Sequence, residues 1–99
     1  MSMASQKSLS DLLQPGGQPI GTAGTSPTIR EFPGGLAAAQ QLFQELTQDG
    51  TDITPPTYAG KLVRLPGGEV IGLRPSSVSG PPTIDVNASW TTIRKIKFL

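Results

Sequence analysis

The chain contains no cysteine and no histidine among its 99 residues. Without cysteine it forms no disulfide and has no thiolate nucleophile. Without histidine it lacks a common zinc ligand and the side chain that most often transfers protons near neutral pH. These two absences exclude zinc fingers, zinc hydrolases, zinc-dependent nucleobase deaminases and histidine acid–base catalysis.

Long apolar runs are also missing from the chain. The longest purely apolar run is Leu36–Ala39, far short of the roughly 20 residues that a membrane-spanning helix needs. The N-terminus has no basic segment followed by an apolar stretch, so we expect no signal peptide. The chain therefore either acts in the cytosol or is a piece of a protein that other sequence exports.

The charged residues are unevenly distributed, although the formal net charge is only +1. Residues 1–57 hold two basic and five acidic residues, whereas residues 58–99 hold six basic and two acidic ones. A basic half on a small domain favours a polyanionic partner, most often nucleic acid. A solvated basic surface is the alternative. Two acids are too few for a two-metal nuclease, and no phosphate loop ending in Gly-Lys-Ser/Thr is present.

The composition divides the chain into two parts. Residues 1–27 are rich in Ser, Gly, Gln, Thr and Pro, which predicts a disordered or linker-like tether without chemistry. Residues 28–99 are predicted to form one domain. Within it, Gly35–Asp49 carries its apolar residues on one helical face, and Gly50 is predicted to end this helix in a left-handed conformation.

Four short extended segments follow the predicted helix. They are Lys61–Leu65, Glu69–Arg74, Pro82–Val86 and Thr91–Phe98. This order predicts an α+β fold in which one main helix packs on a four-stranded antiparallel sheet. The residues expected to be most buried are Phe43, Leu46, Ile71, Leu73, Ile84, Val86, Ile96 and Phe98.

Alternation along the strands assigns most of the polar side chains to the sheet face away from the helix. Cations dominate this set, and a glycine inside a strand allows a ligand to approach the backbone closely. Simple solvation is the alternative, because antiparallel sheets commonly leave one polar face in water. The residues expected on this face are Arg64, Gly72, Arg74, Thr83, Asp85, Lys95 and Lys97.

Three segments, Gly72–Arg74, Ser79–Asp85 and Ile93–Phe98, resemble the C-terminal toxin domains of bacterial contact-dependent inhibition systems and related polymorphic toxins. They are similar in particular to the ribonucleases typified by the anticodon-cleaving colicins. The resemblance implies a fold of the barnase–EndoU–colicin–RelE type, cleavage of RNA without metal or other cofactor, and a cognate immunity protein. It also implies export as the C-terminus of a larger toxin that acts in the target-cell cytoplasm. The chain departs from the pattern at Ala88–Trp90, where a turn containing Gly or Pro is expected.

RNA can be cleaved by attack of its own 2′-hydroxyl, so the protein need supply no nucleophile. Arginine suits the phosphate because its fork donates two parallel hydrogen bonds, and lysine adds a compact charge. Asp85 is the one acid expected on the open face, and therefore the first candidate to accept the 2′-hydroxyl proton, to hydrogen-bond a base edge or simply to hold an arginine. The predicted catalytic residues are Asp85, Arg74, Lys95, Lys97 and Thr83.

Substrate contacts outside this set are predicted on both charged and loop residues. Trp90 is a candidate for stacking on a base, with burial in the core or contact with an immunity protein as its alternatives. The predicted substrate-binding residues are Arg64, Lys61, Ser76, Ser77, Ser79 and Trp90. The sequence thus predicts an endoribonuclease that cleaves tRNA and leaves a 2′,3′-cyclic phosphate. A non-catalytic RNA- or protein-binding module using the same face, and a structural tail of a larger secreted protein, are the alternatives.

Overall fold

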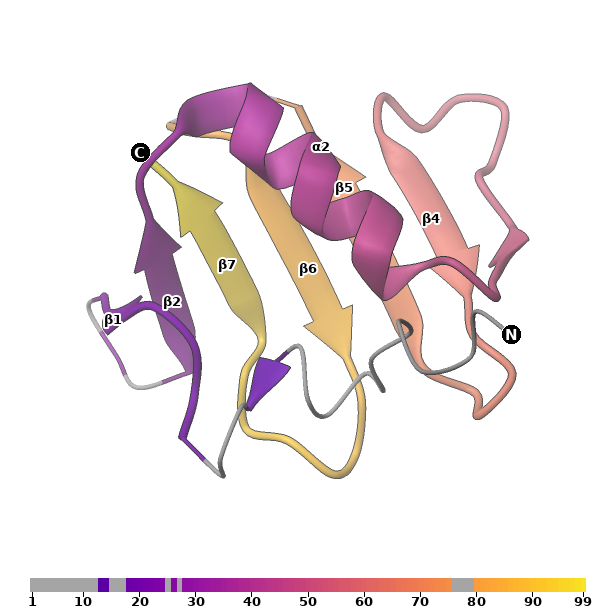
Figure 1. Cartoon of the computed structure of the whole chain (residues 1–99). Coiled ribbons are helices and arrows are strands. Elements are labelled where there is room, and N and C mark those ends of the chain that lie inside the picture. The colour runs from indigo at the N-terminus through magenta and orange to yellow at the C-terminus, as the bar shows by residue number, and fades with distance from the viewer. Residues whose placement is uncertain (1–12, 15–17, 25, 27, 76–79) are drawn as a thin grey trace, which may run out of the picture.

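The computed structural model describes residues 13–14, 18–24, 26, 28–75 and 80–99. The helix α2 (Gly35–Leu46) lies on one face of a seven-stranded sheet (Figure 1). This arrangement confirms the predicted α+β class and the packing of one main helix on a sheet. The predicted four-stranded antiparallel sheet is wrong, because the sheet has seven strands and one of its pairings is parallel.

The four predicted strands form the antiparallel part of the sheet that α2 covers. In sequence order they are β4 (Lys61–Arg64), β5 (Val70–Arg74), β6 (Thr83–Asn87) and β7 (Lys95–Phe98). The last of these is shorter than predicted, since residues 91–94 are not in a strand. The apolar Ile93 does not follow the alternation of Ile96 and Phe98, because it lies in this loop, where its side chain is fully buried.

Three further strands extend the sheet on both sides. The strand β2 (Ile29–Phe32) pairs in parallel with β7, and β1 (Thr22–Ala23) pairs antiparallel with β2. On the other side, β3 (Thr51–Asp52) pairs antiparallel with β4. The spatial order is therefore β1-β2-β7-β6-β5-β4-β3. Both edges end in two-residue strands, which offer little backbone for pairing with another chain.

The helix α2 ends at Leu46, earlier than predicted, and a threonine terminates it. The hydroxyl of Thr47 donates to the Phe43 carbonyl at 2.7 Å, and the Thr47 N–H donates to the same oxygen at 3.1 Å. Gly50 does not have a positive φ, so the prediction that it ends the helix in a left-handed conformation is wrong. A Cβ on Gly50 would instead overlap the Cγ1 of Val63. Glycine is needed there because the chain passes directly over β4.

The core lies between α2 and the sheet. All eight residues predicted to be most buried are buried, which confirms the predicted faces of the central strands, since a slip by one residue would have exposed them. The core also includes Leu13, which is fully buried, and Ile20 packs against it. Arg30 holds this segment by donating from Nε to the Ile20 carbonyl at 2.7 Å and from Nη2 to that of Gly21 at 3.1 Å. The folded unit thus includes residues from the range predicted as a tether.

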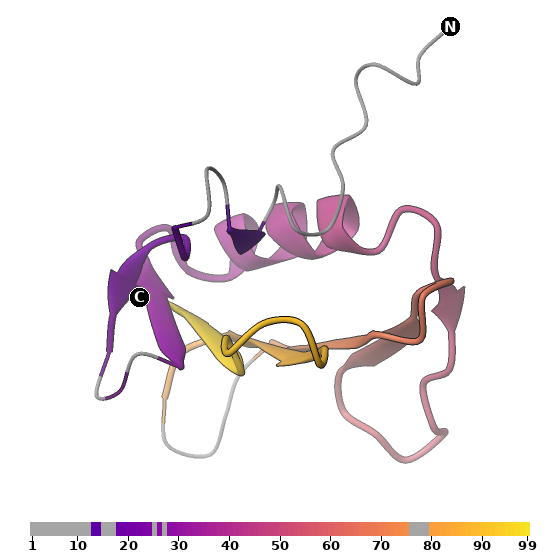
Figure 2. The ribbon, with the colours of Figure 1, turned by 90° about the horizontal axis from the view of Figure 1, so that it is seen from below.

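The described residues form two layers. Seen from below, α2 lies on one side of the sheet, and no helix of the described chain lies on the other side (Figure 2). We call the uncovered side the outer face. Within the described residues, no helix combines the length and the apolar character needed to span a membrane.

Candidate functional site

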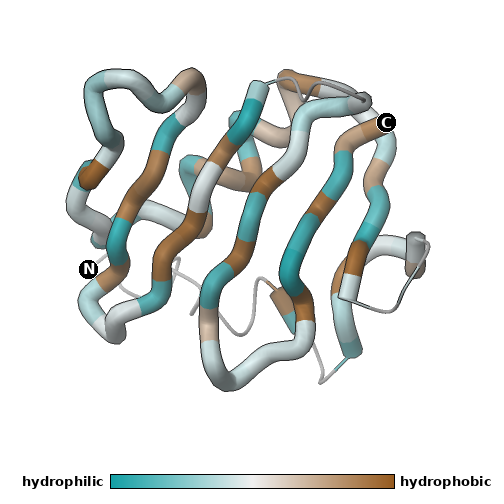
Figure 3. Tube along the Cα trace, turned by 180° about the vertical axis from the view of Figure 1, so that it is seen from behind, coloured by the Kyte–Doolittle hydropathy of each residue, from teal (hydrophilic) through white to brown (hydrophobic). Residues whose placement is uncertain are grey.

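Strand register brings the predicted catalytic residues together on the outer face. Viewed from that side, hydrophilic and hydrophobic residues alternate along the strands (Figure 3). One row across β4, β5, β6, β7 and β2 consists of Leu62, Gly72, Asp85, Lys95 and Ile29. The next row, from β5 to β2, consists of Arg74, Thr83, Lys97 and Glu31. Side chains directly opposite one another start about 4.5–5.5 Å apart, so both rows form one continuous polar surface.

Arg74 and Asp85 form a bidentate ion pair at the centre of this surface. The Arg74 Nε donates to Asp85 Oδ2 at 2.8 Å, and Nη2 donates to Oδ1 at 3.1 Å. The two side chains are 32% and 36% exposed, so the pair is reachable from solvent. These bonds use two of the five N–H donors of the guanidinium. The other three remain for a ligand, while the carboxylate fixes the plane of the fork.

The two lysines of β7 flank this pair. Lys95 lies directly opposite Asp85, and Lys97 lies between Thr83 and Glu31. The side chains of the two lysines, and that of Arg64 on β4, form no hydrogen bond or ion pair with another described residue. The outer face therefore carries three cations whose charge the described part of the chain leaves uncompensated.

Glu31 is a second acid on the outer face, and sequence reasoning missed it because β2 was not predicted. Its carboxylate is turned toward the edge strand β1: Oε2 lies 3.1 Å from the position that a Cβ on Gly24 would take. Glu31 forms no ion pair with Lys97, its neighbour on β7, within the described chain. No period-two alternation marks this four-residue strand, because its apolar residues Ile29 and Phe32 are three positions apart and face opposite sides of the sheet.

Two residues predicted to contact substrate on this face are less open than expected. Thr83 is only 2% exposed, and its hydroxyl donates to the Pro81 carbonyl at 3.1 Å. Gly72 is buried, and a Cβ on it would lie 2.9 Å from Leu62 Cδ2. The glycine thus accommodates the side chain of Leu62, and the predicted close approach of a ligand to its backbone is wrong.

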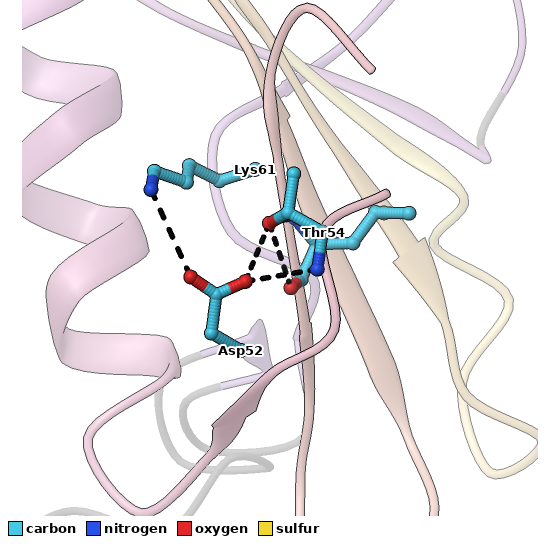
Figure 4. A network of polar contacts seen from close by, with 4 residues as sticks. Asp52, Thr54 and Lys61 are labelled. Carbon is cyan, nitrogen blue, oxygen red and sulfur yellow. Dashed lines mark hydrogen bonds and ion pairs between the residues drawn. The ribbon is translucent and has the colours of Figure 1, made fainter. Parts of the chain in front are cut away.

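Lys61, one of the predicted substrate-binding residues, does not lie on the outer face. It pairs with Leu73 across β4 and β5, on the helix side of the sheet, and its Nζ lies 3.7 Å from Asp52 Oδ2 (Figure 4). Thr54 donates to the other carboxylate oxygen of Asp52, from its hydroxyl at 2.6 Å and from its N–H at 2.8 Å. These two hydrogen bonds, followed by the charge of Lys61, hold the pKa of Asp52 below its ordinary value. This cluster fixes the β3 edge of the sheet.

Trp90 lies at the opposite end of the sheet from Arg74. Trp90 is 40% exposed, and its Nε1 donates to Glu69 Oε2 at 3.0 Å. This bond joins the loop between β6 and β7 to the turn between β4 and β5. Since Thr83 and Asn87 are the two ends of β6, roughly 13 Å of strand separates the Trp90 loop from the row of Arg74. The predicted stacking residue is thus distant from Arg74, Thr83 and Lys97, and lies one row nearer to Asp85 and Lys95.

Three of the predicted substrate-binding residues, Ser76, Ser77 and Ser79, lie outside the described residues. Arg94 counted toward the basic half of the sequence, but its Nη1 donates to the carbonyls of Ala88, Thr91 and Ile93 at 3.3, 2.7 and 3.0 Å. The Arg94 side chain therefore stabilises the loop that precedes β7, and the positive charge of the outer face comes from other residues.

Among the described residues, no group of three or more acidic side chains could hold a metal ion. A groove of about 200 Å³ lies between α2 and the β2–β7 side of the sheet, beside the stacked rings of Phe32 and Phe98, with Glu45 as its charged residue. It contains no cation, nucleophile or acid–base pair, so the outer face remains the candidate site.

Comparison of the chain with protein-family models, with curated proteins and with solved structures finds no match.

Proposed function

We propose that this protein is the toxin domain of a larger secreted bacterial protein and that it cleaves RNA, with tRNA as its first substrate. One observation carries the proposal: Arg74, Asp85, Lys95 and Lys97 converge from three adjacent strands on an open face, where both lysines lack a partner among the described residues. Such a surface suits a phosphodiester, which carries negative charge and gains more of it on the phosphoryl oxygens during the reaction.

The proposed reaction needs no nucleophile from the protein. The 2′-hydroxyl oxygen attacks the adjacent phosphorus, and the bond from phosphorus to the 5′ oxygen breaks. The 2′-hydroxyl loses one proton and the 5′ oxygen gains one, so the products are a 2′,3′-cyclic phosphate and a 5′-hydroxyl. The protein must hold the phosphate in line and stabilise its charge.

Each of the four residues has a role in this scheme. The free N–H donors of Arg74 bind the phosphoryl oxygens, with the guanidinium oriented by its two bonds to Asp85. Lys95 and Lys97 add positive charge on the other side of Asp85, and one of them donates the proton to the leaving oxygen. The carboxylate of Asp85 faces the ribose, where it accepts the 2′-hydroxyl proton or a hydrogen bond from it.

The test is cleavage of total RNA and of total tRNA by the purified chain, once with EDTA and once with magnesium. We expect equal cleavage in both, with every product ending in a 2′,3′-cyclic phosphate. Products with a 3′-hydroxyl, or strict dependence on added metal, would contradict the proposed chemistry. Expression of the chain in the bacterial cytoplasm should arrest growth, whereas a structural tail of a secreted protein should be harmless.

The proposal includes an inhibitor. An exposed cationic nuclease face is most simply blocked by an acidic protein, and opposite charges speed such association. We therefore propose an acidic immunity protein that covers Arg74, Lys95 and Lys97. If a neutralising protein binds over α2 and leaves these residues accessible to solvent, occlusion is the wrong explanation.

A second candidate is a non-catalytic module that binds RNA or protein through the same face. One observation favours it: both oxygens of Asp85 already accept hydrogen bonds from Arg74, which suits a carboxylate that orients an arginine for binding. RNA binding without the appearance of new cleaved ends would support this candidate over the nuclease.

A further inference from the structure

The outer face carries an apolar area directly beside the Arg74–Asp85 pair. Leu62 and Val70 point to this face from β4 and β5 because they alternate with the buried Val63 and Ile71. Both side chains are only half-buried. We call the side chains of Leu62 and Val70 the apolar shelf.

The absence of a side chain at Gly72 lets Leu62 lie flat. The Leu62 Cδ2 occupies the volume next to Gly72, only 2.9 Å from where a Cβ would be. On the far side of Gly72, Asp85 Cβ lies 3.8 Å from that same position. Leu62 therefore extends along the row toward Asp85, and the apolar shelf adjoins the ion pair.

Cations lie on two sides of the apolar shelf, one next to it and one on the far side of Asp85. Arg64 follows Leu62 by two residues on the same face, roughly 6.6 Å along β4. Lys95 lies beyond Asp85 in the row of Leu62. Neither forms an ion pair with a described residue. An apolar surface between two uncompensated cations complements a ligand that has a flat apolar body between two anionic groups.

We propose that the apolar shelf is a nucleobase subsite for single-stranded RNA, whose flanking phosphates contact Arg64 on one side and Lys95 on the other. The proposal rests on the proposed function and adds to it the requirement for an unpaired base, because the flat outer face admits a base to Leu62 only when the base is free to leave its own stack. Single-stranded RNA is the occupant that the surface favours, since the charge pattern matches its backbone and every base has an apolar ring face.

Two substitutions remove the apolar shelf without touching a charge. Leu62→Ala deletes the contact itself. Gly72→Ala inserts a methyl group where Leu62 Cδ2 lies, so the end of a flexible side chain must swing away while the fold survives. The matched control is Ile29→Ala: Ile29 is also apolar and outward-facing in the same row, but its Cγ2 lies 3.1 Å from the position of a Cβ on Gly24, against the β1 side.

The experiment measures binding of a fluorescent hexanucleotide with 2′-O-methyl groups, which blocks cleavage, to the whole chain at low salt. An abasic hexamer of the same charge serves as the second probe. We expect Leu62→Ala and Gly72→Ala each to weaken binding of the RNA hexamer by about 4- to 15-fold, the effect of one or two buried methylene groups. Ile29→Ala should bind as the unchanged chain does, and no variant should alter binding of the abasic hexamer.

The outcomes separate this inference from the proposed function. If the unchanged chain binds the RNA hexamer and the two apolar-shelf variants bind it equally well, the subsite is refuted while the nuclease proposal stands. Equal weakening for both hexamers refutes it too, since the apolar shelf would then act only through the backbone. If the folded chain binds no RNA at all, the proposed function itself fails, and the subsite that rests on it fails too.

Discussion

Removing the Arg74–Asp85 ion pair should cost the fold little. The pair has two short, charge-assisted hydrogen bonds, 2.8 and 3.1 Å long, but about a third of each side chain is exposed. A buried pair of this geometry would contribute roughly 1.5–3 kcal/mol, and an exposed one about 0.2–1 kcal/mol. We therefore expect a coupling free energy of about 1 kcal/mol between the two residues, equivalent to a melting-temperature change of roughly 4–8 °C in a domain of this size.

A double-mutant cycle in urea measures this coupling with Arg74→Ala, Asp85→Ala and the double variant. The Lys61–Asp52 pair is the matched control, because its atoms are 3.7 Å apart and its side chains are 63% and 59% exposed. Its cycle should give less than about 0.5 kcal/mol. If the Arg74–Asp85 coupling exceeds about 3 kcal/mol, the pair chiefly stabilises the fold, and our expectation that its removal destabilises the chain only slightly is wrong. A coupling as small as that of the control would mean that the pair does not persist in solution.

Three further predictions concern other parts of the molecule. Gly50→Ala should destabilise the chain by roughly 1–3 kcal/mol in urea unfolding, because its Cβ would overlap Val63 Cγ1; Gly72→Ala should cost less, since the flexible Leu62 can move. Leu13→Ala should cost about 2–5 kcal/mol, because Leu13 is fully buried; no loss would mean that residues before 28 only tether the domain. An NMR titration should place the pKa of Asp52 below the ordinary value of about 3.9. The small stabilisation from its ionised form should be full above that value and be lost as the pH falls through the lowered pKa, and Asp52→Asn should abolish that pH dependence.

The faces of the central strands were predictable from the sequence. In β6 and β7 the alternation of Ile84 and Val86, and of Ile96 and Phe98, with polar residues fixes which side chains are buried. That alternation also placed Arg74, Asp85, Lys95 and Lys97 on the other face, where the structure has them. Local periodicity sufficed because the apolar residues of β6 and β7 all lie on one face of each strand.

Features that depend on distant segments were not predictable. The parallel pairing of β2 with β7 joins residues 29–32 to residues 95–98, and nothing near either segment signals it. Without β2, the position of Glu31 on the outer face could not be seen. The roles of Gly50 and Gly72 were mistaken for the same reason, because each glycine accommodates a side chain of β4 that is distant in sequence. Lys61 was predicted to bind substrate because of its charge. The alternation along β4, which places it on the same face as the buried Val63, was not applied to it.

The central claim, that the outer face cleaves RNA, is tested most directly by comparing cleavage rates of tRNA in EDTA for three proteins. They are the unchanged chain, Asp85→Ala on the outer face and Lys61→Ala on the helix side of the sheet, with circular dichroism to confirm that each is folded. Loss of one preorganised charged group typically reduces a rate by about 10²–10³-fold. We predict a loss of this order for Asp85→Ala and an unchanged rate for Lys61→Ala. Equal rates for all three proteins, or a loss confined to Lys61→Ala, would contradict the assignment of activity to the outer face.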